Sequence, residues 1–368
     1  MKYPIGIQSF EKLRKEGFLY VDKTKYIYEL VDQGVYYFLS RPRRFGKSLL
    51  ISTIEAYFQG KKELFDGLAI QQEEKEWNSY PILHIDLNTA NFREEDSLYT
   101  ILNDYLCQWE SVYGTRSSEN TLALRFKGII ERAAEKEGRN VVILIDEYDK
   151  PILQTLRNPE LQEKHRNQLK AFYSVLKTQD KYIKFAFITG VTKFGKVSVF
   201  SDLNNLTDIS MDNRYVAICG LTEEELASNF KQGIEELAKT YGDTIEETIA
   251  KLRERYDGYH FEEHTIGIYN PFSVLNAMSR KQYKDYWFET GTPTFLVDLL
   301  KMHNYRLQNL TTERVSSDVI NSIDSMSTNP IPAIYQSGYL TITGYDERFK
   351  KYLLGFPNKE VEEGFINF

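Results

Sequence analysis

Two short stretches of this chain contain residues whose types and spacing could bind a nucleoside triphosphate. The first is Arg41-Pro-Arg-Arg-Phe-Gly-Lys47-Ser48, which directly follows the apolar run Val35–Leu39. The second, about a hundred residues further on, is the apolar run Val141–Ile145 followed by Asp146 and Glu147. Backbone N–H groups of such a loop can cradle phosphates, and the carboxylates can hold a divalent cation. Together the two stretches predict a phosphate site that uses a metal ion.

The first stretch has the order strand, loop, helix that a phosphate-binding loop requires. Lys47 is expected to reach the β- and γ-phosphates, and Ser48 to bind Mg²⁺. Apolar residues at helical spacing up to Tyr57 predict a helix that starts near Gly46. The predicted nucleotide contacts are Arg41, Arg43, Arg44, Phe45, Gly46, Lys47, Ser48, Leu49 and Thr189.

The loop departs from the pattern G-x-x-x-x-G-K-[ST] at its first position. Arg41 stands where the pattern has glycine, and Pro42 removes one N–H donor from the cradle. The arginines at 41, 43 and 44 could replace part of that donation, because guanidinium groups bind phosphate oxygens in pairs. A basic turn beside a chance Gly-Lys-Ser is the alternative interpretation.

The second stretch ends in carboxylates at the carboxyl end of a predicted strand, where open α/β sheets bind ligands. Asp146 is expected to hold Mg²⁺ together with Ser48, and Glu147 to activate the attacking water as a general base. Asp149 is predicted to be a helix cap or a surface charge instead of a third site carboxylate.

A further strand over 184–190 ends in polar residues that could sense the γ-phosphate. Thr189 and Thr192 are the candidates, with Lys193 behind them. A turn with a capping hydroxyl explains these residues equally well.

The composition excludes several other classes of protein. The chain has 368 residues, 42% hydrophobic and 27% charged, which is typical of globular domains. A net charge of −7 argues against broad nucleic-acid binding. Cys107 and Cys219 stand alone, so the sequence predicts neither a zinc site nor a disulfide framework, and a reducing cytoplasm fits. Neither a membrane-spanning run nor a signal peptide is evident, and no membrane partner is expected.

The alternation of strands and helices up to about residue 215 predicts an α/β fold with a parallel sheet. The amino-terminal segment is expected to hold short helices, with Tyr20, Asp22 and Lys23 in a structural role more than beside a base. The predicted strands cover 35–39, 80–87, 141–145 and 184–190, and the predicted helices cover 97–113, 121–136 and 160–177.

After Gly220 the alternation of strands and helices ends. A capping box, Thr222 with Glu225, starts a mostly helical stretch that predicts a lid. Helices followed by a short β segment over 338–343 predict a small winged-helix-like region. The predicted division is a core over 1–215, a lid over 216–285 and a winged-helix-like region over 286–368. A helix that begins near Pro357 indicates that a further domain could follow.

Eight motifs together resemble the AAA-ATPase-like family of P-loop proteins, close to the archaeal-ATPase and STAND branches. They are Tyr20-Val-Asp-Lys-Thr24, Arg41-Pro-Arg-Arg-Phe-Gly-Lys-Ser48, Leu144-Ile-Asp-Glu-Tyr-Asp-Lys-Pro151, Thr189-Gly-Val-Thr-Lys-Phe194, Tyr256-Asp-Gly-Tyr259, Tyr269-Asn-Pro-Phe272, Trp287-Phe-Glu-Thr-Gly291 and Gln336-Ser-Gly-Tyr-Leu-Thr341.

The resemblance spans nearly the whole chain and implies that the altered loop is normal for the family. It also implies a P-loop ATPase core, a helical lid, a winged-helix-like region and ATP as the nucleotide. Family members usually continue into a PD-(D/E)XK nuclease-like domain, whose signature this chain lacks, so nuclease chemistry is not assigned to it.

The leading prediction is an ATP-binding protein that hydrolyses ATP slowly with Mg²⁺ and acts as a regulatory or conformational switch. Lys47 and Glu147 would be the catalytic residues. One alternative is a nucleotide-gated interaction module without turnover, which would act on a protein partner or an appended effector domain. The other is the ATPase part of a nucleic-acid-processing protein.

Overall fold

The chain forms two compact units, each assembled from separate stretches of sequence. The computed structural model describes residues 1–193, 199–200, 203, 205–291, 300–301, 314–321 and 329–366. The sheet unit consists of Thr24–Ser40 and Thr53–Ile209. The loop–lid unit consists of Met1–Lys23, Arg41–Ser52 and Ser210–Phe368. The helix α3 (Lys47–Phe58) therefore begins in the loop–lid unit and ends in the sheet unit.

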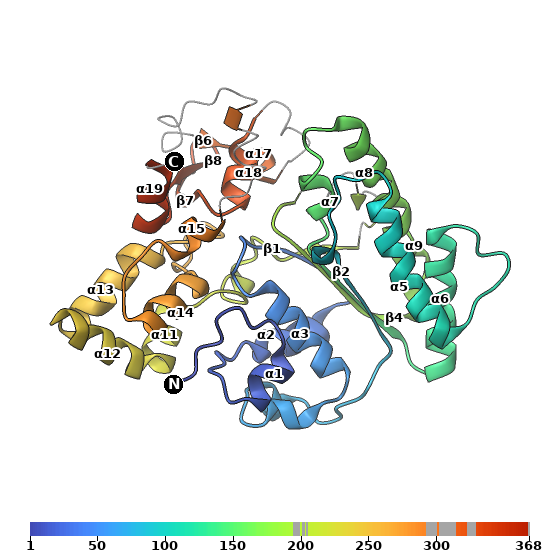
Figure 1. Ribbon diagram of the computed structural model, residues 1–368, viewed down its shortest axis with the longest axis horizontal. Helices are drawn as coiled ribbons and strands as arrows, with labels where there is room; N and C mark the ends of the chain where they lie inside the picture. The colour runs from blue at the N-terminus through green and yellow to red at the C-terminus, as the bar shows by residue number, and fades with distance from the viewer. Residues whose placement is uncertain are drawn as a thin grey trace. The chain divides into compact units, whose positions relative to one another are not determined.

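A parallel sheet forms the core of the sheet unit (Figure 1). Each residue of β1 and β3 is buried, which explains why their sequences are nearly unbroken apolar runs without alternation. The predicted α/β class with a parallel sheet is confirmed. The strands are β1 (Tyr36–Ser40), β2 (Ile82–Asp86), β3 (Val141–Asp146), β4 (Ile183–Gly190) and β5 (Thr207–Asp208), in the spatial order β2-β3-β4-β1-β5.

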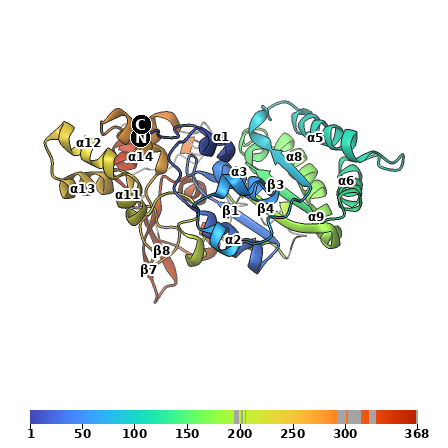
Figure 2. The same ribbon diagram turned by 90° about the horizontal axis from the view of Figure 1, so that it is seen from below.

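The helices of the sheet unit include the pair predicted over 97–113 and 121–136. Figure 2 shows α5, α6 and α8 grouped beside β3 and β4. Thr121 begins α6 by accepting a hydrogen bond from Leu124 N at 3.2 Å. The helical elements are α2 (Thr24–Gln33), η1 (Lys62–Phe65), α4 (Ile70–Glu73), η2 (Leu87–Thr89), α5 (Ser97–Tyr113), α6 (Leu122–Glu137), α7 (Lys150–Leu153), α8 (Pro159–Tyr173), α9 (Val175–Thr178) and η3 (Asp180–Tyr182).

The loop–lid unit contains the helices predicted after Gly220. Its helical elements are α1 (Phe10–Lys15), η4 (Asn213–Tyr215), α11 (Glu223–Asn229), α12 (Lys231–Tyr241), α13 (Ile245–Tyr256), α14 (Pro271–Arg280) and α15 (Tyr286–Gly291). The capping box of Thr222 and Glu225 is present, as predicted, and a second one starts α13.

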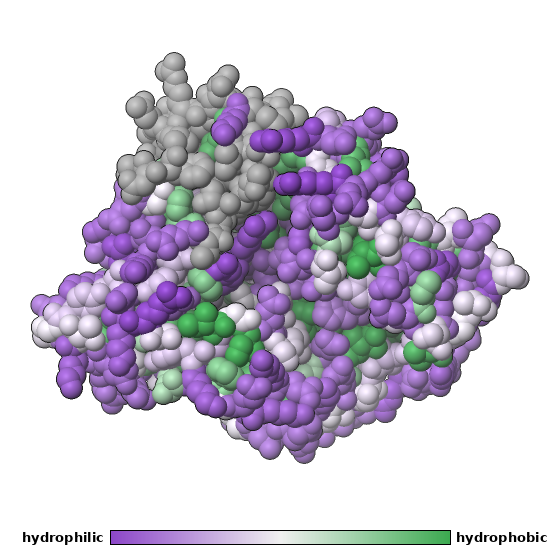
Figure 3. Space-filling view, viewed as in Figure 1, coloured by the Kyte–Doolittle hydropathy of each residue, from purple (hydrophilic) through white to green (hydrophobic). Residues whose placement is uncertain are grey.

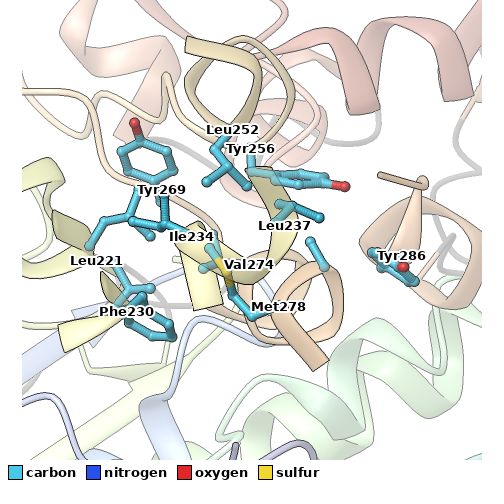
Figure 4. Packing of buried hydrophobic residues seen from close by; sticks show 12 residues of the cluster. Leu221, Phe230, Ile234, Leu237, Leu252, Tyr256, Tyr269, Val274, Met278 and Tyr286 are labelled. Carbon is cyan, nitrogen blue, oxygen red and sulfur yellow. The ribbon is translucent and has the colours of Figure 1, made fainter. Parts of the chain in front are cut away.

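A buried hydrophobic cluster holds these helices together (Figure 4). Its members are Leu221, Leu226, Phe230, Ile234, Leu237, Leu252, Tyr256, Tyr269, Val274, Ala277, Met278 and Tyr286. The amino-terminal segment packs against it, since Tyr3 stacks on Phe230 with the ring centroids 6.0 Å apart. The lid helices thus have their own core within the loop–lid unit.

The described carboxyl-terminal residues form helices and a small antiparallel sheet in the order β6-β8-β7. The elements are β6 (Arg314–Val315), α17 (Ser317–Asn321), α18 (Ile331–Gln336), β7 (Thr341–Asp346), β8 (Lys351–Gly355) and α19 (Lys359–Ile366). The winged-helix-like identity of this region stays a prediction, as does the three-part division at residues 215 and 285.

Hydrophilic residues cover much of the face shown in Figure 3, with small hydrophobic patches between them. Across the described residues, each helix is too short or too polar to cross a lipid bilayer.

Candidate functional site

The loop over 41–46 connects the end of β1 to the start of α3, so the predicted order of strand, loop and helix is confirmed. Gly46 has a φ of 94°, a backbone conformation that favours glycine. A Cβ built on Gly46 would meet no atom within 4 Å. The loop therefore presents open space above a backbone that only glycine adopts without strain.

Protein donors hold the carbonyl groups of this loop. Lys47 Nζ donates to Arg41 O (3.0 Å) and Pro42 O (3.2 Å), Trp287 Nε1 to Arg43 O (3.0 Å), and Gly220 N to Phe45 O (3.1 Å). The described peptide bonds are all trans, so each carbonyl points opposite to the following N–H. Each of the N–H groups of Arg43, Arg44 and Gly46 therefore points away from the donor that holds the carbonyl of its own peptide.

Arg41 occupies the position where the common pattern has glycine, and its side chain is only 1% exposed. Its guanidinium donates to Ser210 O at 2.7 Å and Tyr215 O at 3.2 Å, and lies 3.9 Å from the centroid of the Phe261 ring. These contacts favour a role in anchoring the loop. Phosphate contact by Arg41 stays a prediction.

The other predicted loop contacts differ in burial. Arg44 is exposed, has a φ of 65° and places its guanidinium 4.0 Å from the centroid of the Phe272 ring. Arg43, Ser48 and Leu49 are half-buried, with Ser48 in the first turn of α3. The predicted nucleotide contacts of these four residues stay predictions.

Aromatic and proline packing fixes the remaining loop residues. Phe45 is buried and meets Tyr259 edge to face, with the ring centroids 4.8 Å apart. Pro42 lies so close to Gly338 that a Cβ on that glycine would come within 2.7 Å of it. The motifs around residues 259 and 338, which had no predicted role, therefore shape this loop.

At the carboxyl end of β3, two predicted site residues meet within the sheet unit. Thr189 Oγ1, on β4, donates to Asp146 Oδ1 at 2.6 Å. Asp146 is 3% exposed and also accepts a hydrogen bond from Glu147 N at 3.0 Å. Glu147 has a φ of 54°, which is uncommon for a residue other than glycine and is often found at functional sites.

Asp149 is fully buried, so the prediction of a surface charge is wrong. Although it precedes α7, its side chain makes no capping hydrogen bond to that helix. It accepts hydrogen bonds from Thr192 N at 2.7 Å, Thr192 Oγ1 at 2.6 Å and Val191 N at 3.3 Å. Asp149 thus fixes the turn after β4. A Cβ built on Gly190 would lie 2.6 Å from Asp149 Oδ1, so only glycine fits there.

The other sensor candidates have defined partners in the sheet unit. Thr192 is bound by Asp149, and Lys193 Nζ lies 3.0 Å from Asp208 Oδ2 on β5. Of the three candidates, Thr189 has a hydrogen bond to Asp146 among the described residues. Its predicted contact with the nucleotide is not tested by this geometry.

The sheet register places the end of β1 at the edge that carries Asp146. In the sheet unit β4 lies between β1 and β3, with Ser40 opposite Gly190 and Ile145 opposite Ile188. The strands run parallel, so Ser40 and Asp146 lie at the same, carboxyl edge. Residue 41 follows Ser40 directly in the chain.

His84, whose pKa is affected by the charge of Asp146, was not predicted from the sequence to belong to the site. Its Nδ1 lies 3.0 Å from Glu55 Oε2 on α3. Burial lowers the pKa of His84, but the hydrogen bond and charge of Glu55, followed by the charges of Asp146 and Asp86, outweigh it and raise that pKa. No local pattern marks this pair, because its members lie on different elements.

Lys23, which was expected to have a structural role, is 8% exposed and lies in the loop–lid unit. Its Nζ donates to both carboxylate oxygens of Glu225, at 2.5 and 2.6 Å. Burial lowers the pKa of Lys23, and the charge of Glu225 partly offsets that effect. The bond joins the amino-terminal segment to the capping box of α11.

Within the described residues, no group of three or more His, Cys, Asp or Glu side chains could hold a metal ion. Mg²⁺ typically binds through one or two protein ligands together with substrate phosphates and water. The predicted Mg²⁺ ligands, Ser48 and Asp146, stay predictions.

The parallel sheet, the glycine loop and the acidic strand end define a P-loop ATPase. The sequence model of the predicted AAA-ATPase family matches residues 4–200, and the chain belongs to this family. It is also 38% identical to an uncharacterized protein in the vnfD 5′ region of Azotobacter chroococcum mcd 1. That similarity extends over 365 residues, which are 98% of this chain and 68% of the relative.

Among solved structures, the chain is similar to the ORC2 protein of Aeropyrum pernix, determined as ADPNP–ADP complexes. The identity is 10%, the TM-score is 0.31, and the match covers 97% of this chain and 93% of that one. The parallel sheet in the order β2-β3-β4-β1-β5 defines the fold.

Proposed function

We propose that this protein binds ATP with Mg²⁺ and hydrolyses it slowly, as a regulatory or conformational switch. Lys47 would hold the β- and γ-phosphates, and Ser48 and Asp146 would hold Mg²⁺, which neutralises charge on the phosphates. Glu147 would orient and deprotonate the attacking water. Thr189 would keep the Asp146 carboxylate in position through their hydrogen bond.

The observation that carries this proposal is the orientation of the loop backbone. Four of its carbonyls accept hydrogen bonds from protein donors, so the N–H groups that follow three of them face the other way. Gly46 adds open space at the same loop. Phosphoryl transfer depends mainly on positioning and charge neutralisation, so these few groups suffice.

The first test is a calorimetric and thermal-shift titration of ATP with Mg²⁺. Wild-type protein should gain stability with ATP by mass action, because the ligand binds only the folded state. Lys47→Ala should weaken ATP binding on the order of a hundredfold, about 2.7 kcal/mol. Lys127→Ala, at a lysine that is 45% exposed on α6, is the matched control and should bind as wild type does. Equal affinities for all three proteins would refute the phosphate site.

A second candidate function is a nucleotide-gated interaction module without turnover. The contacts of Gly220, Phe272 and Trp287 with the loop favour it, because they link the predicted lid and the region that follows it to the loop itself. Release of phosphate separates the two functions. Glu147→Gln should slow release by on the order of a hundredfold or more if Glu147 is the general base. The control is Glu63→Gln, at an exposed residue of η1. Equal background rates for wild type and Glu147→Gln would leave the gating module.

A further inference from the structure

The peptide between Arg43 and Arg44 has an unusual conformation that other residues hold in place. Arg44 has a φ of 65°, in the left-handed region that side chains rarely adopt. Trp287 Nε1 donates to the carbonyl on one side of Arg44, and Gly220 N donates to the Phe45 carbonyl on the other. The Arg44 side chain lies over Phe272. The surrounding structure therefore fixes this peptide from three directions.

Trp287 is itself held rigidly. It is 1% exposed, and its ring packs against Tyr339 with the ring centroids 5.0 Å apart. Its backbone N–H donates to Glu360 Oε1 at 2.7 Å. The same carboxyl accepts a hydrogen bond from Ser273 Oγ at 2.8 Å. A continuous path of contacts thus runs from α14 and α19 through α15 to the loop, all within the loop–lid unit.

We infer that Trp287 is a positioning residue for the nucleotide: its indole N–H holds the Arg43 carbonyl so that the Arg44 N–H faces the phosphates. This inference rests on the proposed function. The loss of the bond would let the peptide rotate toward a relaxed conformation, and the Arg44 N–H would then leave the cradle. Nucleotide affinity would thereby depend on α15 and α19, and nucleotide would in turn stabilise those helices.

A purely structural role makes a different prediction. A buried tryptophan that only fills the core affects stability, and Phe at the same place retains most of its apolar contacts. The positioning role depends on Nε1–H, which Phe lacks. The variant Trp287→Phe therefore separates the two roles.

The experiment measures ATP affinity with Mg²⁺ in four proteins: wild type, Trp287→Phe, Trp109→Phe and Lys47→Ala. Trp109, on α5, is half-buried and serves as the matched control. Trp287→Phe should bind ATP about tenfold more weakly, as expected for the loss of one hydrogen bond that positions a donor. Trp109→Phe should bind as wild type does, and both Phe variants should keep their melting temperatures without nucleotide to within a few degrees.

Wild-type affinity in Trp287→Phe, beside a loss in Lys47→Ala, would overturn this inference and leave the proposed function intact. Failure of wild-type protein to bind ATP would overturn both. If Trp287→Phe does not fold, tryptophan fluorescence gives a second test. The chain has three tryptophans, and replacing the other two by Trp77→Phe and Trp109→Phe leaves Trp287 as the remaining one. Its emission should shift with ATP and not in combination with Lys47→Ala, and an unchanged spectrum would refute the positioning role.

Discussion

The loop after β1 and the carboxyl end of β3 are organised in opposite ways. In the loop the side chain of Arg41 is buried against protein carbonyls, and protein donors hold the loop's own backbone carbonyls. At the end of β3 the side chains of Asp146 and Asp149 make the contacts, to Thr189 and Thr192 on or just after β4. A backbone site depends on whatever holds its carbonyls, whereas a side-chain site depends on strand register.

The largest expected effect comes from the space above Gly46. Gly46→Ala should weaken ATP binding on the order of a hundredfold, about 2.7 kcal/mol, because the methyl group adds strain and occupies the cradle. Isothermal titration measures the change. Gly17→Ala is the matched control, since Gly17 also has a positive φ (69°) and open space around a built Cβ. If both variants lose ATP affinity to the same extent, backbone strain and not the cradle accounts for the loss.

The next effect tests the side-chain half of the comparison. Asp149→Asn should lower the free energy of unfolding by about 2 kcal/mol, because an amide cannot accept all three hydrogen bonds that the buried carboxylate accepts. Urea denaturation measures this change. Asp96→Asn, at a residue whose side chain is 82% exposed, should leave stability unchanged. A neutral Asp149→Asn would mean that the turn after β4 does not need this carboxylate.

The third prediction concerns the pH dependence of stability due to Glu360, which binds the backbone N–H of Trp287. Burial raises the pKa of Glu360 to about 8, from an ordinary value of 4.5. The folded protein therefore holds a proton that the unfolded chain releases, and stability falls as pH rises toward and through about 8. Between pH 7 and 9 wild type should lose roughly 1.4 kcal/mol more than Glu360→Gln, which cannot titrate. Parallel stability curves for the two proteins would contradict a proton on Glu360.

The smallest expected effect concerns one hydrogen bond at the end of β3. Thr189→Val removes the donor to Asp146 and should cost about 1 kcal/mol of stability. It should also reduce Mg²⁺-dependent phosphate release more than ATP binding, because the carboxylate loses its orientation. Thr178→Val, on α9, where the hydroxyl donates to the Val175 carbonyl of its own helix, is the control. Equal loss of release in both variants would remove the special role of Thr189.

Much of the fold follows from local patterns. The apolar runs predicted the strands at 35–39, 141–145 and 184–190, and the capping box predicted the start of α11 at Thr222. These elements are correct because periodicity and caps act over a few residues. Asp149 was predicted to be a helix cap or a surface charge because its partners, Val191 and Thr192, lie more than forty residues away.

The sequence by itself determined the order of strand, loop and helix at Lys47 and the acidic end of the strand at Asp146. Both depend on neighbouring residues alone, so their chemistry is visible before the chain is folded. Only the tertiary structure decided that Gly220 and Trp287 hold the loop carbonyls and that Arg41 is buried. Those bonds join residues that are far apart in sequence, and a hydrogen bond forms only where packing brings donor and acceptor within about 3 Å.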